Sequence, residues 1–159
     1  MADAIAMNQA KTTYETLLRC LDAHKLHYDR NDEKFSVSFG MSGDDIPMNF
    51  RIFADPERNV LRLISTVPFK IPEDKRIETA AAISVINDTL VIGAFGFDVT
   101  DGHLYFRVTN SYVDSILGEE TITYMLSAAI ALVEKYNDKL MLLGKGLLSL
   151  EEFLKNEQN

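Results

Sequence analysis

The sequence predicts an α+β fold with the element order α-βββ-α-ββ-α, in which helices pack on one face of a five-stranded, mostly antiparallel sheet. Two observations predict it: five segments alternate apolar and polar residues, and other segments repeat apolar residues every three or four positions. A third is the stretch from Glu73 to Thr109, where a helical pattern changes at Gly93 into that of a β-hairpin. With no internal repeat or linker, the 159 residues are expected to form a single domain, 1–159.

The first helix is predicted from apolar residues at helical spacing, namely Tyr14, Leu17, Leu18 and Leu21. Thr12 or Thr13 is the expected cap, and Leu26 is expected near the end of the helix.

Three strands are expected next, because apolar residues alternate with polar ones over Glu33 to Met41, Ile46 to Ile52 and Leu61 to Val67. Pro68 is expected to close the third strand, since proline has no N–H for a strand ladder. The short links between the segments favour an antiparallel meander.

The central helix is predicted to follow Pro72 and to reach Val91. Alternating residues then predict a hairpin, and Asp101-Gly102 is typical of a two-residue type I′ turn.

The strongest helical pattern runs from Ile122 to Tyr136, with Leu140 and Leu143 as an extension and Gly144 as the expected stop. Ser149 and Glu152 form a predicted capping box for a short terminal helix.

The formal net charge of −8 argues against nucleic acid and anionic membranes as partners, although it also serves solubility. The single cysteine, Cys20, cannot form an intramolecular disulfide, which favours a reducing compartment. The N-terminus lacks a signal-peptide pattern, and no segment approaches the ~20 apolar residues that span a bilayer. A cytoplasmic location is predicted.

No catalytic residues, metal ligands or cofactor are predicted. Cys20, His24 and His27 could share a helix surface. The sequence indicates no further ligand that would complete a metal site with them. Adjacent carboxylates such as Asp44-Asp45 and Glu119-Glu120 fall at turns and helix starts, where negative charge has a structural role. The glycine-rich segments lack the pattern of a phosphate-binding loop.

Residues that alternate with the predicted core would form a second face of the sheet. We expect a partner-binding surface on this face, formed by Arg51, Phe53, Arg62, Ile64, Tyr105 and Arg107. A solvated sheet face would show the same alternation.

Several motifs resemble the YbjN-type family, a group of bacterial domains described as sensory transduction regulators: Val67-Pro68, Ile86-Asn87, Gly93-x-Phe95-x-x-Asp98, Gly102 and Tyr105-x-Arg107. The resemblance covers most of the chain and implies a fold similar to type III secretion chaperones. It assigns no catalytic residue. In physical terms, Gly93 would allow close helix-to-sheet approach, and Asn87 would tie the helix end to the hairpin backbone.

The leading hypothesis is a non-catalytic protein-binding or chaperone-like regulatory module, a homodimer whose client or regulator the sequence does not identify. Binding would use an exposed strand edge by β-augmentation, or apolar grooves beside the helices. The alternative is a small-molecule sensor with a ligand between sheet and helices. An enzyme is a third hypothesis, for which the sequence shows no reactive cluster.

Overall fold

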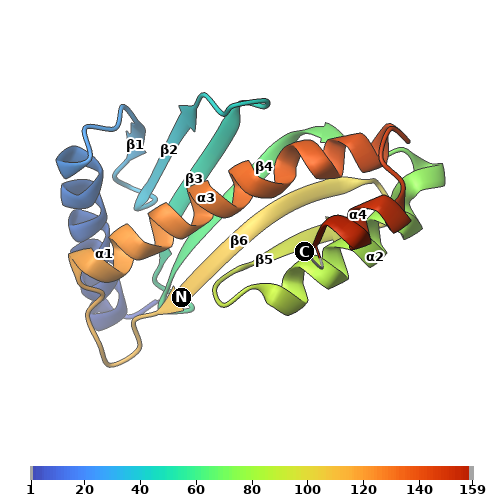
Figure 1. The fold of residues 1–159 in the computed structure, drawn as a ribbon. Coiled ribbons are helices and arrows are strands. Elements are labelled where there is room, and N and C mark those ends of the chain that lie inside the picture. Colours follow the sequence, from blue (N-terminus) through green and yellow to red (C-terminus); the bar gives the residue numbers. More distant parts are fainter. Residues whose placement is uncertain (1, 158–159) are drawn as a thin grey trace.

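A computed structural model describes residues 2–157 of the chain and contains one antiparallel sheet with helices packed against it (Figure 1). In chain order the elements are α1 (Ala4–Ala23), β1 (Asp29–Asn31), β2 (Ser36–Met41), β3 (Met48–Asp55), β4 (Val60–Lys70), the 3-10 turn η1 (Glu73–Lys75), α2 (Arg76–Thr89), β5 (Ala94–Asp98), β6 (His103–Ser111), α3 (Glu119–Gly144) and α4 (Leu150–Glu157). The strand order is β1-β2-β3-β4-β6-β5, and every neighbouring pair is antiparallel.

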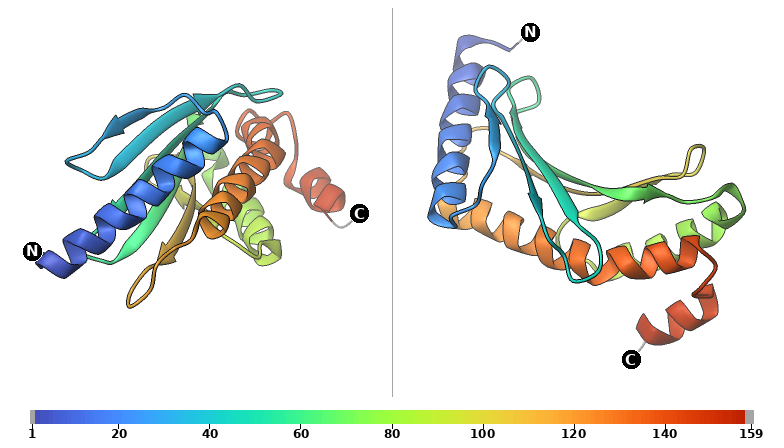
Figure 2. Two further views of the ribbon diagram at one scale, coloured as in Figure 1. Left: turned by 90° about the vertical axis from the view of Figure 1, so that its left-hand side faces the viewer. Right: turned by 90° about the horizontal axis from the view of Figure 1, so that it is seen from above.

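The helices lie on one face of the sheet, as predicted from the alternation. The core side chains of the strands point to that face and include Phe39, Phe50, Ile52, Leu63 and Phe106. In Figure 1, α1 lies at one end of the sheet, α3 crosses its middle, and α2 and α4 lie at the other end. In the two views of Figure 2, the opposite face of the sheet carries no helix within residues 2–157.

The sheet has six strands, so the prediction of five was wrong. The additional strand, β1, is only three residues long, and all three are exposed. A strand without a buried face has no apolar alternation, and the sequence pattern therefore could not reveal it.

The third predicted strand does not end at Pro68, because β4 continues to Lys70. The register between β4 and β6 shifts between Thr66 and Lys70. A proline is tolerated at such an irregularity, since no ladder hydrogen bond is required of its nitrogen.

The first helix begins earlier than predicted, and its cap is Asp3, which accepts a hydrogen bond from Ala6 N–H at 2.8 Å. Thr12 lies inside the helix, where its hydroxyl donates to the carbonyl of Asn8 at 3.0 Å. The helix ends at Ala23, three residues before Leu26.

The turn between β5 and β6 is not the predicted type I′ turn. Asp98 and His103 are the last paired residues of the two strands, so the loop consists of the four residues from Val99 to Gly102. Gly102 alone among them has a positive φ, of 80°. Asp98 shapes the loop by accepting hydrogen bonds from the backbone N–H and the hydroxyl of Thr100, at 2.8 and 2.6 Å.

At the end of α3 the helix stops two residues later than predicted. Gly144 is its last residue, and Gly146, with φ of 69°, takes the left-handed conformation that ends the helix. Gly144 instead permits close packing, because a Cβ there would lie 2.8 Å from Cδ1 of Ile71.

The terminal helix α4 begins with the predicted capping box. The hydroxyl of Ser149 accepts a hydrogen bond from Glu152 N–H at 3.2 Å, and Glu152 accepts one from Ser149 N–H at 2.9 Å. Phe153 anchors the helix in the core of the same chain and is fully buried. Within residues 2–157, no helix has both the length and the apolar character needed to cross a membrane.

Candidate partner-binding face

The sheet face that no helix covers is called the outer face here, and it consists of the strand residues that alternate with the core. The burial patterns of β3 and β4 show this alternation along nearly their whole length. The six residues predicted as a partner surface, Arg51, Phe53, Arg62, Ile64, Tyr105 and Arg107, all lie on the outer face.

Strand register brings five of these residues together. Ile64 on β4 pairs with Arg51 on β3 and with Arg107 on β6, so these three residues form one row across the sheet. Phe53 and Arg62 pair in the neighbouring row. Tyr105 is one row further on, in the opposite direction, where it pairs with Thr66.

Phe53 is flanked by two guanidinium groups. The Cζ atoms of Arg51 and Arg62 lie 5.5 and 5.6 Å from the centroid of its ring. At these distances the ring quadrupole attracts both cations, by about 0.5–1 kcal/mol each at a partly exposed site. The apolar ring and the two cations therefore form one unit, which the alternation alone did not reveal.

The arginines of the outer face are not neutralised by the chain itself. Among residues 2–157, Arg51, Arg62 and Arg107 form no ion pair with a carboxylate. The Nε atom of Arg62 is buried and has no hydrogen-bond partner. A buried donor without an acceptor costs about 1–3 kcal/mol, so Arg62 carries an unsatisfied group beside Phe53.

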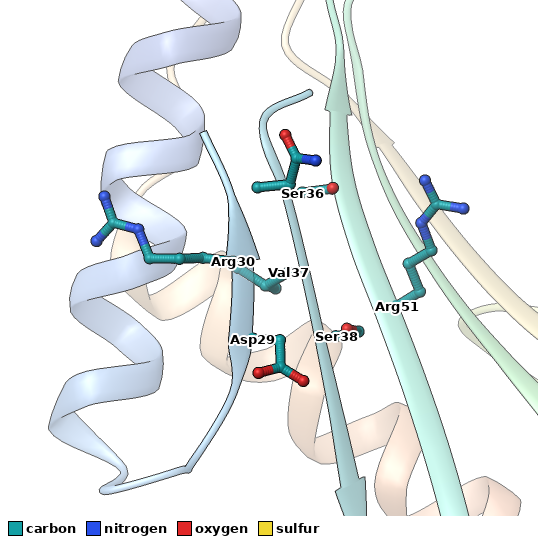
Figure 3. Close-up of a pocket in the computed structure, with 7 residues that line it drawn as sticks. Asp29, Arg30, Ser36, Val37, Ser38 and Arg51 are labelled. Carbon is teal, nitrogen blue, oxygen red and sulfur yellow. The ribbon is translucent and has the colours of Figure 1, made fainter. Parts of the chain in front are cut away.

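A hollow of about 410 Å³ opens on the outer face over β3. Its lining is Ser38, Asn49, Phe50, Arg51, Phe53, Ile64 and Thr66. A smaller hollow of about 160 Å³ adjoins it at β1 and β2 and shares Arg51 and Ser38 (Figure 3). In Figure 3, the side chains of Arg30 and Arg51 point away from each other. Arg30 forms an ion pair with Asp32, with 2.8 Å between Nη2 of Arg30 and Oδ2 of Asp32.

Gly96 on β5 supports Tyr105 at the other end of the outer face. The two residues pair across β5 and β6, and a Cβ at position 96 would collide with the ring of Tyr105. The sequence prediction included Tyr105 but missed Gly96, whose role depends on its lack of a side chain.

The edge of the sheet at β5 is partly closed by a side chain from α2. The carboxamide of Asn87 donates to the carbonyl of Phe95 at 2.9 Å and accepts from its N–H at 2.8 Å, as the sequence predicted. Gly93 also permits close packing beside this edge, because a Cβ there would lie 2.5 Å from Cζ of Phe106. The opposite edge is β1, which offers only three residues. These features leave little strand edge for an added partner strand.

The ionisable groups with shifted pKa values lie away from the centre of the outer face and have structural partners. Arg30 and Tyr14 donate hydrogen bonds to Asp32 and hold its pKa below the ordinary value. Burial, together with Asp32, raises the pKa of Tyr14 to about 12. Cys20 is buried, and within residues 2–157 no cluster of at least three His, Cys, Asp or Glu side chains is placed to hold a metal ion.

Comparison with known proteins gives a family match and similar structures. The family model described as "YbjN: Putative bacterial sensory transduction regulator" matches residues 13–141. The crystal structure of YbjN from E. coli superposes with a TM-score of 0.58 at 13% identity, covering 79% of this chain and 92% of that one. The search of curated protein sequences gave no significant match.

Two complexes are more distant. The ExsC–ExsE complex gives a TM-score of 0.49 at 14% identity, and the HopA1–SchA chaperone–effector complex gives 0.44 at 18% identity. Each alignment covers 86% of this chain and 93% of the other chain.

Proposed function

The chain belongs to the YbjN family, and from this premise we propose that it is a non-catalytic, protein-binding regulatory module whose outer face holds a segment of a partner protein. The observation that supports this proposal most is the hollow of about 410 Å³ over Phe53 and Ile64, with Arg51 at its side. We also propose that residues 1–159 act as a single domain.

The outer face has the composition of a binding surface. Phe53, Ile64 and Tyr105 are only half-buried, and they lie among exposed polar and charged residues. Protein interfaces commonly combine an apolar centre, rich in aromatic residues and arginine, with a polar rim. A partner segment over Phe53 and Ile64 would bury these side chains and release the water that covers them.

The face is a better binding surface than the sheet edges. At the β5 edge, both backbone polar groups of Phe95 already bond to Asn87, and β1 is too short to pair with more than a few residues. β-Augmentation needs a row of free backbone groups, so the partner is expected to lie on the sheet and not beside it.

The alternative of a small-molecule sensor gains no support from the packing between sheet and helices. Phe50, Phe106 and Tyr136 fill this interior and are each at most 1% exposed. A ligand in that position would have to displace well-packed side chains.

We further propose a homodimer, on the evidence of an apolar hollow on the helical side of the molecule. This hollow of about 410 Å³ lies between the end of α2 and α3, and its lining includes Leu90, Val91, Tyr124 and Leu132. Val91 is 96% exposed and Tyr124 is 55% exposed, which is unfavourable for a monomer in water. Light scattering should give twice the mass of the chain, and Val91→Glu should give the monomer mass.

The experiment for the proposed function is site-specific photo-crosslinking in the native cells. A photo-reactive residue at Asn49, which lines the outer-face hollow, should form a discrete adduct with another protein. The matched control is the same residue at Lys11, an exposed position on α1. Equal adducts at both positions, or none at Asn49, would contradict the proposed use of the outer face.

A further inference from the structure

We infer that the partner segment on the outer face is acidic, with two carboxylates flanking an apolar side chain. This inference rests on the proposed function and adds the chemistry of the partner. It follows from the signs of the charges, from the spacing of the arginines, and from an unsatisfied donor.

The charge of the outer face is opposite to that of the whole chain. The chain has 24 acidic and 16 basic residues, yet the centre of the face carries Arg51, Arg62 and Arg107 without a paired carboxylate. The carboxylates of this face lie at its margins, on the edge strand β1 and at the ends of β3 and β5: Asp29, Asp55 and Asp98. Asp55 pairs with Arg58, and Asp98 accepts hydrogen bonds from Thr100.

The strand register sets the spacing of the positive charges. Arg51 and Arg107 lie two strands apart with Ile64 between them, which places their Cα atoms about 10 Å apart. In an extended peptide, alternate side chains point to the same side and repeat at about 6.6 Å. A segment of the form acidic-x-apolar-x-acidic therefore places its carboxylates about 13 Å apart, within reach of two long arginine side chains.

Arg62 provides the independent observation. Its Nε is buried without a partner, beside the Phe53 ring and next to the row of Arg51, Ile64 and Arg107. A guanidinium group offers paired donors that match the two oxygens of a carboxylate. A carboxylate placed over Phe53 would therefore meet a guanidinium group that forms no ion pair within residues 2–157.

The test is a selection of short random peptides displayed on phage, with the intact protein as bait. The binding variant is Arg51→Gln combined with Arg107→Gln, both at exposed positions. The matched control is Lys11→Gln combined with Lys25→Gln, which removes the same charge from exposed positions on and just after α1. Circular dichroism melts establish that all proteins are folded.

The wild-type protein should enrich peptides with two Asp or Glu residues flanking an apolar residue. A synthetic copy of the strongest peptide should bind the arginine double variant at least about tenfold more weakly and the lysine control within about twofold. Added salt should weaken the wild-type complex, because the attraction is between charges.

Different failures have different meanings. If the enriched peptides are not acidic but lose binding with Ile64→Ser, the acidic partner is wrong and the proposed function stands. If no enriched peptide depends on Arg51, Arg107 or Ile64, both are wrong. Binding of single-stranded nucleic acid through the arginines, or a change of oligomeric state in the arginine double variant, would assign the face to phosphates or to a second copy and overturn the inference.

Discussion

The side chain of Asn87 replaces a neighbouring strand for Phe95, because it satisfies both backbone groups of that residue at the edge of the sheet, at 2.8 and 2.9 Å. A carboxamide carries one donor and one acceptor in the arrangement that a peptide group would present. This contact joins the end of α2 to β5, two elements that the chain links through the turn at Gly93.

Asn87→Ala should lower the free energy of unfolding by about 1–3 kcal/mol, since it leaves a half-buried backbone N–H and C=O without partners. Urea denaturation measures this loss, and the amide hydrogen of Phe95 should exchange faster. Asn8→Ala on the exposed face of α1 is the matched control and should change stability by less than about 0.5 kcal/mol. Equal effects of the two variants would show that the Asn87 contact contributes nothing.

Phe153→Ala should destabilise the chain by about 3 kcal/mol, because this fully buried side chain anchors α4. Limited proteolysis should then cut α4 more readily, while the rest of the chain stays protected. The test is made in the Val91→Glu background, which is expected to be monomeric; if Phe153→Ala costs nothing there, α4 packs on a second subunit and its position in one chain is wrong.

Gly96→Ala should displace the ring of Tyr105, since the new Cβ would occupy the space of that ring. The expected cost is about 1 kcal/mol, and it should largely disappear when Tyr105 is also changed to Ala. A double-mutant cycle measures this coupling. Independent, additive effects would show that the ring does not rest on Gly96.

Glu157 should make stability depend on pH in the acid range. Burial alone would raise its pKa, but hydrogen bonds from Lys139 at 2.8 Å and Tyr136 at 3.0 Å outweigh burial and hold the pKa below the ordinary 4.5. A lowered folded-state pKa contributes stability above about pH 4.5, and this is lost as the pH falls through the folded value.

The side chain of Glu157 is only 10% exposed, so Glu157→Gln should cost about 1–2 kcal/mol at neutral pH. The difference from the wild type should shrink as the pH falls below 4.5 and through the folded-state pKa, as measured by urea denaturation at several pH values. A difference that stays constant with pH would contradict the role of the ionised carboxylate.

The sequence predicted those features in which local chemistry and burial agree. The alternation of Phe50 and Ile52 with exposed neighbours identified a strand, and Ser149 with Glu152 identified a helix start. Asn87 could be linked to the hairpin because a polar side chain at a helix end needs a partner. The predicted family is confirmed by the match over residues 13–141.

Features decided by distant contacts were not predictable. Gly144 looked like a helix stop, yet it serves packing against Ile71, which is remote in sequence. The outer-face residues could be named from alternation, but the position of two guanidinium groups beside Phe53 depends on side-chain conformations that no spacing rule specifies. Whether a partner binds there stays a prediction.

The partly closed edge at β5 has a consequence for the behaviour of the protein at high concentration. Sheets with long free edges can join edge to edge by pairing the backbones of their outer strands, which is a route to fibrils. Here Asn87 blocks one edge at Phe95, and the other edge exposes a strand of three residues with charged side chains at Asp29 and Arg30. The same arrangement that directs a partner onto the sheet therefore also protects the folded chain against self-templated aggregation.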